Sequence, residues 1–174
     1  MAQRTTDSFE TCILPHLDDA YTLARHLLGD EHDAQDAVQD AALRAFRHFT
    51  GFSGDNARAW FLSIVRNCCL TLRHGRAVDR ATVPFGDQHL SIVHESDQAD
   101  AAAIAQSERA LVTHALADMP VEFREVLVLR EVQGLSYAEI SDIVGVPAGT
   151  VMSRLSRARH RLAAKLGMTD KEAC

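Results

Sequence analysis

One segment near the C-terminal end of the chain, GLSYAEISDIVGVPAGTVMSRLSRAR, constrains the fold more than any other stretch. Ser136 is followed three residues later by Glu139, which is the pattern of a capping box at the start of a helix. Gly145 can end that short helix, and Pro147 is well tolerated at the opening of the next one. A short helix, a tight turn with glycine and a longer second helix form a helix-turn-helix unit. The sequence therefore predicts this unit over residues 135–166.

The second helix of this unit is basic, although the whole chain has a formal net charge of −6. At about 100° per residue, Val151, Leu155 and Ala158 fall on one side of the helix and are expected to face the core. Small polar and arginine side chains fall elsewhere, where small residues allow close approach to a DNA groove and arginine reaches phosphates and guanine edges. The residues expected to contact DNA are Thr150, Ser153, Arg154, Ser156, Arg157 and Arg161.

Position along this helix separates two kinds of DNA contact. The N-terminal half of a recognition helix usually supplies base contacts, whereas Arg159, Arg161 and Lys165 are expected at phosphates or in solvent. An ordinary amphipathic surface helix is the alternative, because most runs of charge are solvated faces. That alternative does not explain the capping box, the turn and the charge asymmetry together. The sequence therefore favours a DNA-binding helix.

Helical periodicity covers most of the remaining chain, apart from a glycine-containing loop at residues 51–56. The pattern fails over residues 78–102, where a proline, a glycine and five acidic residues accompany one arginine. Helical spacing returns beyond that stretch. We therefore predict an all-α fold of two small helical domains, residues 1–77 and 103–168, joined by an acidic flexible linker.

Charge distinguishes two surfaces in the N-terminal half of the chain. Residues 30–40 contain five acids and no lysine or arginine, which suits a basic surface on a protein partner and repels DNA. A solvated acidic helix face explains the same charges equally well. Residues 57–80 have the opposite sign, with five arginines against one aspartate. A basic helix after a loop can hold the backbone of single-stranded DNA.

Taken together, these blocks resemble the extracytoplasmic-function group of bacterial RNA polymerase sigma factors. The domain of that family that reads the promoter −35 element is similar to the run LADMPVEFREVLVLREVQGLSYAEISDIVGVPAGTVMSRLSRARHRL. The helix pair that grips the β′ clamp of core polymerase is similar to GDEHDAQDAVQDAALRAFRHF. The loop and helix that melt and read the −10 element are similar to FSGDNARAWFLSIVRNCCLTLRHGR.

The resemblance implies roles for residues outside the helix-turn-helix unit. Those implied to contact core polymerase are Asp33, Asp36, Val38, Gln39 and Asp40. Those implied to bind the −10 element are Phe52, Asp55, Asn56, Ser63, Arg66 and Asn67. Trp60 is expected in the core instead, because an aromatic residue at helical spacing is more often a core residue. In the family the linker threads the polymerase cleft, and many relatives carry Arg or Lys where this chain has Met152.

The function implied is that of an alternative sigma factor, which directs core RNA polymerase to specific promoters under the control of an anti-sigma factor. A helix-turn-helix regulator that acts without polymerase is the alternative for residues 135–166. A sigma-mimicking domain that sequesters an anti-sigma factor is disfavoured by the intact basic recognition helix. Catalysis is disfavoured as well, because the chain has no HExxH, no GxSxG and no glycine-rich phosphate loop. We therefore expect no enzyme activity, no cofactor and no metal, although His32, Asp33 and Asp36 can share a helix face.

Composition bounds where the protein works. No apolar run approaches the roughly 20 residues that span a bilayer, so no membrane insertion is expected. The N-terminus MAQRTTDSFE has no apolar signal core, which favours a cytoplasmic location. The four cysteines form no CxxC pair and no zinc-like spacing with histidine, so we expect reduced thiols.

Overall fold

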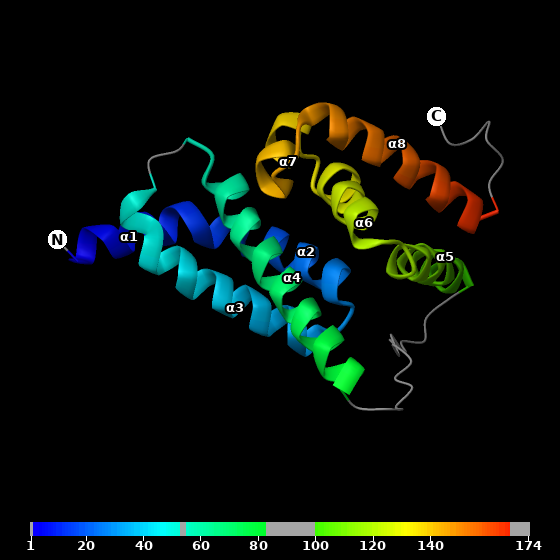
Figure 1. Ribbon diagram of the computed structural model, residues 1–174, viewed down its shortest axis with the longest axis horizontal. Coiled ribbons are helices and arrows are strands. Elements are labelled where there is room, and N and C mark those ends of the chain that lie inside the picture. The colour runs from blue at the N-terminus through cyan, green and yellow to red at the C-terminus, as the bar shows by residue number, and fades with distance from the viewer. Residues whose placement is uncertain (1, 53–54, 83–99, 168–174) are drawn as a thin grey trace.

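A computed structural model describes residues 2–52, 55–82 and 100–167 of the chain (Figure 1). Within these ranges every regular element is helical, which confirms the predicted all-α class. None of the described helices is long and apolar enough to cross a bilayer. The described structure therefore consists of packed helices, and the loops that join them set where each helix face lies.

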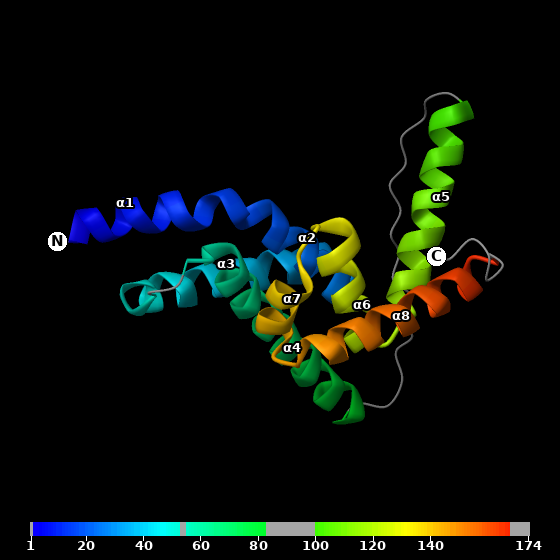
Figure 2. The ribbon, with the colours of Figure 1, turned by 90° about the horizontal axis from the view of Figure 1, so that it is seen from above.

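Four helices and two 3₁₀ turns make up the N-terminal half, in the order α1 (Ala2–Ile13), η1 (Leu14–His16), α2 (Leu17–Leu28), α3 (Glu31–His48), η2 (Phe49–Gly51) and α4 (Ala57–Thr82). Helices α2, α3 and α4 pack on one another, while the start of α1 extends away from them (Figure 2). Gly29 ends α2 with φ 81°, a left-handed conformation that glycine adopts without steric cost. Asp30 then caps α3 by accepting a hydrogen bond of 3.0 Å from the Asp33 backbone N–H.

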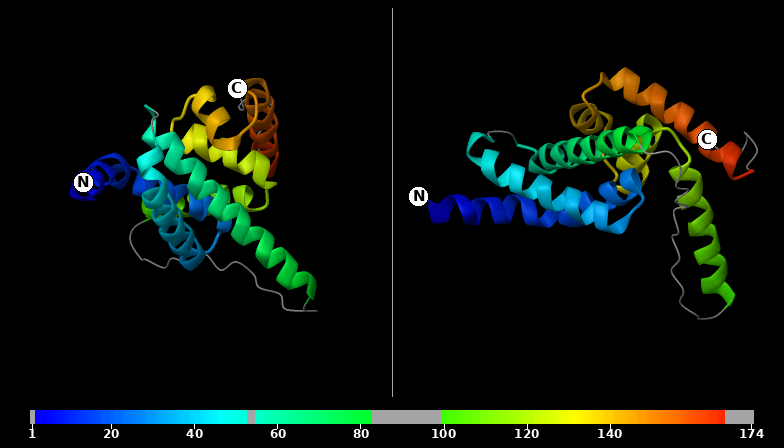
Figure 3. Two further views of the ribbon diagram at one scale, coloured as in Figure 1. Left: turned by 60° about the vertical axis from the view of Figure 1, so that its left-hand side comes forward. Right: turned by 60° about the horizontal axis from the view of Figure 1, so that its bottom comes forward.

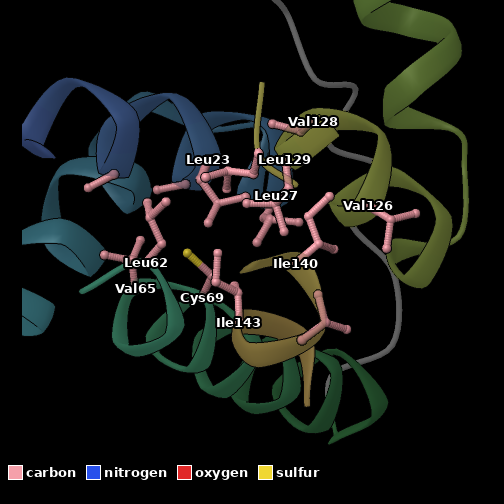
Figure 4. Packing of buried hydrophobic residues seen from close by; sticks show 14 of the residues in the cluster. Leu23, Leu27, Leu62, Val65, Cys69, Val126, Val128, Leu129, Ile140 and Ile143 are labelled. Atoms are coloured by element: carbon pink, nitrogen blue, oxygen red, sulfur yellow. The ribbon is translucent and has the colours of Figure 1, made fainter. Parts of the chain in front are cut away.

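The buried side of α3 is a stripe of alanines, namely Ala34, Ala37, Ala41 and Ala45, all of which are fully inaccessible to solvent. Such small side chains let α3 lie close to α2 and α4, whose larger residues fill the space between the helices. Leu23 and Leu27 of α2 meet Leu62 and Val65 of α4 in this core (Figure 4). Asp36 and Asp40 are thereby left on the outer side of α3.

The C-terminal half contains α5 (Asp100–Ala117), α6 (Val121–Leu127), a π-helical turn η3 (Val128–Val132), α7 (Tyr137–Val144) and α8 (Ala148–Lys165). Helix α5 projects from the rest of the molecule (Figure 3). Helices α7 and α8 form the predicted helix-turn-helix unit. Both halves of the capping box are present, since Ser136 Oγ accepts from the Glu139 backbone N–H and Glu139 accepts from the Ser136 backbone N–H. Gly145 ends α7 with φ 72°.

The two halves share one hydrophobic core. Helix α7 packs on α4, and α6 packs on α2. Ile140 and Ile143 of α7 point toward Leu27 of α2 and Cys69 of α4 (Figure 4). Burial of these apolar side chains stabilises the contact between the halves.

The predicted linker over residues 78–102 overlaps the ends of two helices, because α4 continues to Thr82 and α5 begins at Asp100. Residues 83–99 between them lie outside the described residues. Trp60, predicted to be a core residue, is partly buried against the core, with its ring 4.8 Å from the Phe52 ring between centroids. Phe46 in α3 is 47% exposed and meets the Phe9 ring at its edge.

Candidate nucleic-acid interface

The recognition helix α8 has a buried side and an open side, as its periodicity predicts. Val151, Leu155 and Ala158 are buried against the rest of the C-terminal half. The opposite side is exposed and carries Met152, Ser153, Ser156, Arg157 and His160. Thr150 is half-buried, and its carbonyl accepts a 3.0 Å hydrogen bond from Ser153 Oγ. The first turns of α8 therefore present small polar groups and one thioether to solvent.

The cations in the last turns of α8 have partners within the molecule. Arg159 Nη2 lies 2.7 Å from a carboxylate oxygen of Glu131, and Lys165 Nζ lies 3.0 Å from Asp118. The Arg161 guanidinium lies over the Phe123 ring at 4.7 Å from its centroid. Within the described part of the chain, Arg157 is the one cation of α8 that is exposed and without such a partner. Arg157 is thus the arginine of α8 most available to DNA.

Arg154 points inward rather than toward solvent. Its Nη1 lies 3.5 Å from Oε1 of Glu125 in α6, and its side chain is 26% exposed. Arg66 of α4 binds the same carboxylate from the other half of the molecule, with Nε–Oε2 at 2.7 Å and Nη2–Oε1 at 3.1 Å. Glu125 itself is only 1% exposed. One buried carboxylate therefore joins a residue predicted to bind the −35 element to a residue predicted to bind the −10 element.

A second predicted −10 residue is also engaged across the two halves. Asn56 donates from Nδ2 to Oε1 of Glu139 at 2.9 Å, while its own Oδ1 accepts from the Ala59 backbone N–H and so caps α4. Hydrogen bonds to Ser136 lower the pKa of Glu139, and the bond from Asn56 acts in the same direction. Glu139 therefore makes two kinds of contact. It completes the capping box of α7, and it accepts a hydrogen bond from Asn56 in the loop before α4.

The other predicted −10 residues are distributed differently. Asp55 and Asn67 are exposed. Phe52 is half-buried against Trp60, and Ser63 donates from Oγ to the Trp60 carbonyl at 2.7 Å. The structure thus brings Asn56 and Arg66 together with acids of the C-terminal half and leaves Asp55 and Asn67 open.

The residues implied to contact polymerase lie along α3. Asp36, Gln39 and Asp40 are exposed, whereas Val38 packs partly against the core. Asp33 is half-buried and forms an ion pair with Arg76 of α4. Sequence reasoning did not include the half-exposed Leu43 and Phe46 in this surface, although they follow Asp36 and Asp40 at helical spacing. These apolar residues continue the exposed surface of α3 from its acidic part toward its C-terminal end.

Two further buried polar residues were missed at the sequence level. Arg124 is 5% exposed and donates to the backbone carbonyls of His26 at 3.0 Å and Met119 at 2.8 Å, and to that of Ala117. It therefore ties the C-terminal ends of α2 and α5, where helix dipoles favour a cation. Burial lowers the pKa of Arg124 to about 10. Gln133 is 8% exposed and donates from Nε2 to the Asp19 carbonyl at 2.6 Å. Helical periodicity gives no signal for either residue, because it assigns polar side chains to the surface.

The cysteines and acids offer no metal chemistry in the described residues. No group of three or more His, Cys, Asp or Glu side chains there is close enough to hold a metal ion. Cys68 and Cys69 are free and buried, and burial raises their pKa values to about 11 and about 12. Such thiols stay protonated and unreactive near neutral pH.

Comparison with known proteins matches two family descriptions to separate parts of the chain. The family described as Sigma-70 region 2 matches residues 12–77, and the family described as Sigma-70, region 4 matches residues 109–162. The chain is 37% identical over 161 residues to the ECF RNA polymerase sigma factor SigM of Mycobacterium tuberculosis, covering 92% of this chain and 78% of SigM.

A second relative and a solved structure are similar over most of this chain. ECF RNA polymerase sigma factor SigE of Mycolicibacterium smegmatis is 32% identical over 168 residues, and the alignment covers 92% of this chain but 62% of SigE. The sigma factor RpoE, crystallised in complex with the anti-sigma factor NepR from Bartonella quintana, has a TM-score of 0.75 at 27% identity. That match covers 92% of this chain and 97% of RpoE.

Proposed function

The chain belongs to the ECF family of RNA polymerase sigma factors, and from this premise we propose that it directs core RNA polymerase to promoters by binding both the −35 and −10 elements. The observation that carries the proposal is the open side of α8, the second helix of a capped helix-turn-helix unit, where small polar residues and Arg157 are exposed. In this proposal the polymerase catalyses RNA synthesis.

At the −35 element, α8 enters the major groove with its first turns against the bases. Ser153 and Ser156 permit close approach, and Arg157 reaches a guanine edge or a phosphate. Arg154 joins this surface once it leaves Glu125. Arg159, Arg161 and Lys165 are held by their own acidic or aromatic partners and contribute to the phosphate side.

Met152 supplies an apolar contact within this otherwise polar surface. Its side chain is 50% exposed in the first turns of α8, next to Ser153 and one turn before Ser156. The chemical group in the major groove that suits a thioether chain is the C5 methyl of thymine. A thymine is therefore expected at the position of the −35 element that faces Met152.

The N-terminal half binds single-stranded DNA at the −10 element and holds the polymerase. Asn67 and Asp55 are exposed and accessible to bases. Asn56 lies next to Asp55 in the loop before α4, and Arg66 precedes Asn67 within α4. Asp36, Gln39 and Asp40 form the acidic surface of α3 that meets the basic β′ clamp, together with Leu43 and Phe46. The similar RpoE structure contains an anti-sigma factor, which supports the same class of regulator for this chain.

Reconstituted transcription tests the proposal. The purified chain, added to core RNA polymerase and a supercoiled genomic template library, is expected to produce transcripts that start at a shared promoter sequence. A regulator that acts without polymerase would instead bind an operator tightly while producing no specific initiation with core enzyme. Such a result would overturn the sigma role.

A further inference from the structure

We propose that Phe9 of α1 is a positioning residue for the loop before α4, and that it acts on −10 recognition through a chain of aromatic rings. The −10 part rests on the proposed function, whereas the link from α1 to the loop rests on ring contacts alone. Phe9 precedes residues 12–77, the part matched to Sigma-70 region 2, so the family match gives it no role.

The loop before α4 has an aromatic ring at each end. Phe52 precedes the loop and Trp60 lies in the first turn of α4, and their ring centroids are 4.8 Å apart. Backbone bonds hold the same two ends, since the Phe52 N–H donates to the Phe49 carbonyl at 3.0 Å and the Trp60 N–H donates to the Asn56 carbonyl at 3.1 Å. Asp55 and Asn56, between these ends, are exposed. A shift of Phe52 against Trp60 would therefore move the groups that the proposed function places at the −10 element.

Phe49 in η2 is the centre of the chain of rings. The Phe9 ring meets the Phe49 ring edge-on, with 5.3 Å between centroids and 90° between planes. Phe49 also stacks on Phe52, with centroids 6.1 Å apart and planes 22° apart, and its centroid lies 6.4 Å from that of Trp60. Edge-on and stacked arrangements are both favourable for aromatic pairs. Phe9 is therefore linked through one ring to both ends of the loop.

These rings lie at the edge of the hydrophobic core, where α1 contacts η2 and α4 (Figure 1). Phe9 is 8% exposed, whereas Phe46, whose ring meets it edge-on at 5.2 Å between centroids, is exposed. The other three rings, those of Phe49, Phe52 and Trp60, are half-buried. Loss of the Phe9 ring would therefore remove support from the loop while leaving the core between α2, α3 and α4 in place.

An ordinary packing role for Phe9 predicts a different outcome from a positioning role. Loss of packing lowers stability and so lowers activity at every promoter alike. Loss of positioning leaves folded molecules in which the loop has its binding arrangement for a smaller fraction of the time, and the apparent affinity for the −10 element falls by that fraction. The ratio of activities on an intact and an altered −10 element therefore separates the two roles.

Three variants of α1 provide the comparison. Phe9→Leu removes the ring and keeps an apolar side chain. Ile13→Val is its matched control, because it changes another fully buried apolar residue of α1 that has no ring, at a similar expected loss of stability. Phe9→Tyr keeps the ring and is the rescue variant, since the ring edge can still meet Phe49. Urea denaturation establishes that each variant is folded.

Trp60 fluorescence measures the link in the full chain, without DNA or polymerase. Trp60 is the single tryptophan of the chain and lies against Phe52. We expect the emission maximum of Phe9→Leu to move to longer wavelength, because water reaches Trp60 when the ring packing loosens. Ile13→Val and Phe9→Tyr should keep the emission maximum of the parent chain. An unchanged maximum in Phe9→Leu, or an equal shift in Ile13→Val, would overturn the link.

Transcription with core polymerase measures the effect on −10 recognition. The templates are a promoter that the parent chain uses and the same promoter with its −10 element scrambled. Each chain is added at a concentration that saturates core polymerase, because Phe9 also touches Phe46 on the proposed polymerase surface. The activity ratio of the two templates should fall about two- to tenfold in Phe9→Leu, the range that corresponds to loss of one aromatic pair, and should not change in Ile13→Val or Phe9→Tyr. An equal ratio in all four chains would overturn the role of Phe9 at the −10 element.

Failure of the proposed function would look different. If the sigma role is wrong, the parent chain produces no promoter-specific transcripts and the −10 role of Phe9 falls with it, while the emission of Phe9→Leu still shifts. Promoter-specific transcription by the parent chain together with an unchanged emission maximum in Phe9→Leu would instead overturn the aromatic link alone.

Discussion

The guanidinium of Arg66 in α4 forms a two-point ion pair with the carboxylate of Glu125 in α6, at 2.7 Å and 3.1 Å, across the two halves of the molecule. The carboxylate is inaccessible to solvent, so removal of one partner would leave the other charge buried and unpaired. This pair links the two halves through a residue that the family resemblance assigns to DNA.

Arg157 is expected to be essential for −35 recognition. Arg157→Glu should lower promoter-dependent transcription about tenfold or more, because it replaces an exposed cation on the proposed DNA-facing side of α8 by an anion. Binding to core polymerase, measured by native gel shift, should not change, because Arg157 is remote from α3. Arg159→Glu is the matched control, since it makes the same change of charge at a residue that already pairs with Glu131, and should reduce transcription much less. Equal activity of Arg157→Glu and the parent chain would remove Arg157 from the reading surface.

Met152 is expected to sense a thymine methyl group. Replacing the contacted thymine by deoxyuridine, which lacks only that methyl, should weaken binding of the −35 duplex by ~0.8 kcal/mol, or about fourfold. Met152→Ala should bind the two duplexes equally well, and Ser156→Ala should keep the difference. A scan of every thymine in the element, read by anisotropy, identifies the position. Insensitivity of the parent chain at all positions would refute the contact while leaving −35 binding intact.

The capping box at Ser136 should contribute measurable stability. Ser136→Ala removes the acceptor of the Glu139 backbone N–H and should lower the free energy of unfolding by about 1 kcal/mol, as measured by urea denaturation. Ser136→Asp should retain most of the stability, because aspartate also caps helices. Ser8→Ala, on the exposed side of α1, is the control and should have little effect. A loss that is equal for Ser136→Ala and Ser8→Ala would contradict the role of the cap.

Stability should fall as the pH drops through the range of histidine titration. Burial lowers the pKa of His26 from 6.5, and the charges of Arg124 and Arg25 act in the same direction. Because the unfolded chain then binds more protons than the folded chain, His26 disfavours folding as the pH falls below the unfolded value.

The measurement for His26 compares urea denaturation at about pH 7.5 and about pH 5.5, on either side of the unfolded pKa. His26→Gln should lose less stability between the two than the parent chain does. His32→Gln, at an exposed position, should lose as much as the parent chain. A His26→Gln variant as sensitive to acid as the parent would exclude His26 as a source of the pH dependence.

Local features of this fold follow closely from the sequence. Gly29 and Gly145 end α2 and α7 with positive φ, and Ser136 and Glu139 begin α7 as their spacing predicts. These helix ends depend on a few neighbouring residues, so they can be predicted from a short stretch of sequence. The buried face of α8 follows for the same reason, because helical periodicity is local.

Contacts between distant residues could not be predicted in this way. Arg154 looked like a DNA-facing residue, and its partial burial against Glu125 depends on how α6, α8 and α4 meet. Arg124 and Gln133 are buried because backbone carbonyls of α2 accept their hydrogen bonds, and no spacing in the sequence encodes which carbonyls those are. The packing of the two halves on each other could not be predicted for the same reason, since it joins residues that are tens of positions apart in the sequence.

Substitutions on the two sides of α3, the inner side with the alanine stripe and the outer side, are expected to have different effects. Its inner side has no room, so enlarging Ala37 or Ala41 would push α3 away from α2 and α4, at a cost of about 1–3 kcal/mol. Its outer side touches nothing at Asp36 or Gln39 that the fold requires. If Asp36 and Gln39 contact polymerase as we propose, affinity for polymerase can therefore be changed along one edge of a single helix, by selection or by design, with little change in stability. Competition among sigma factors for a limited supply of core enzyme could be adjusted on that edge alone.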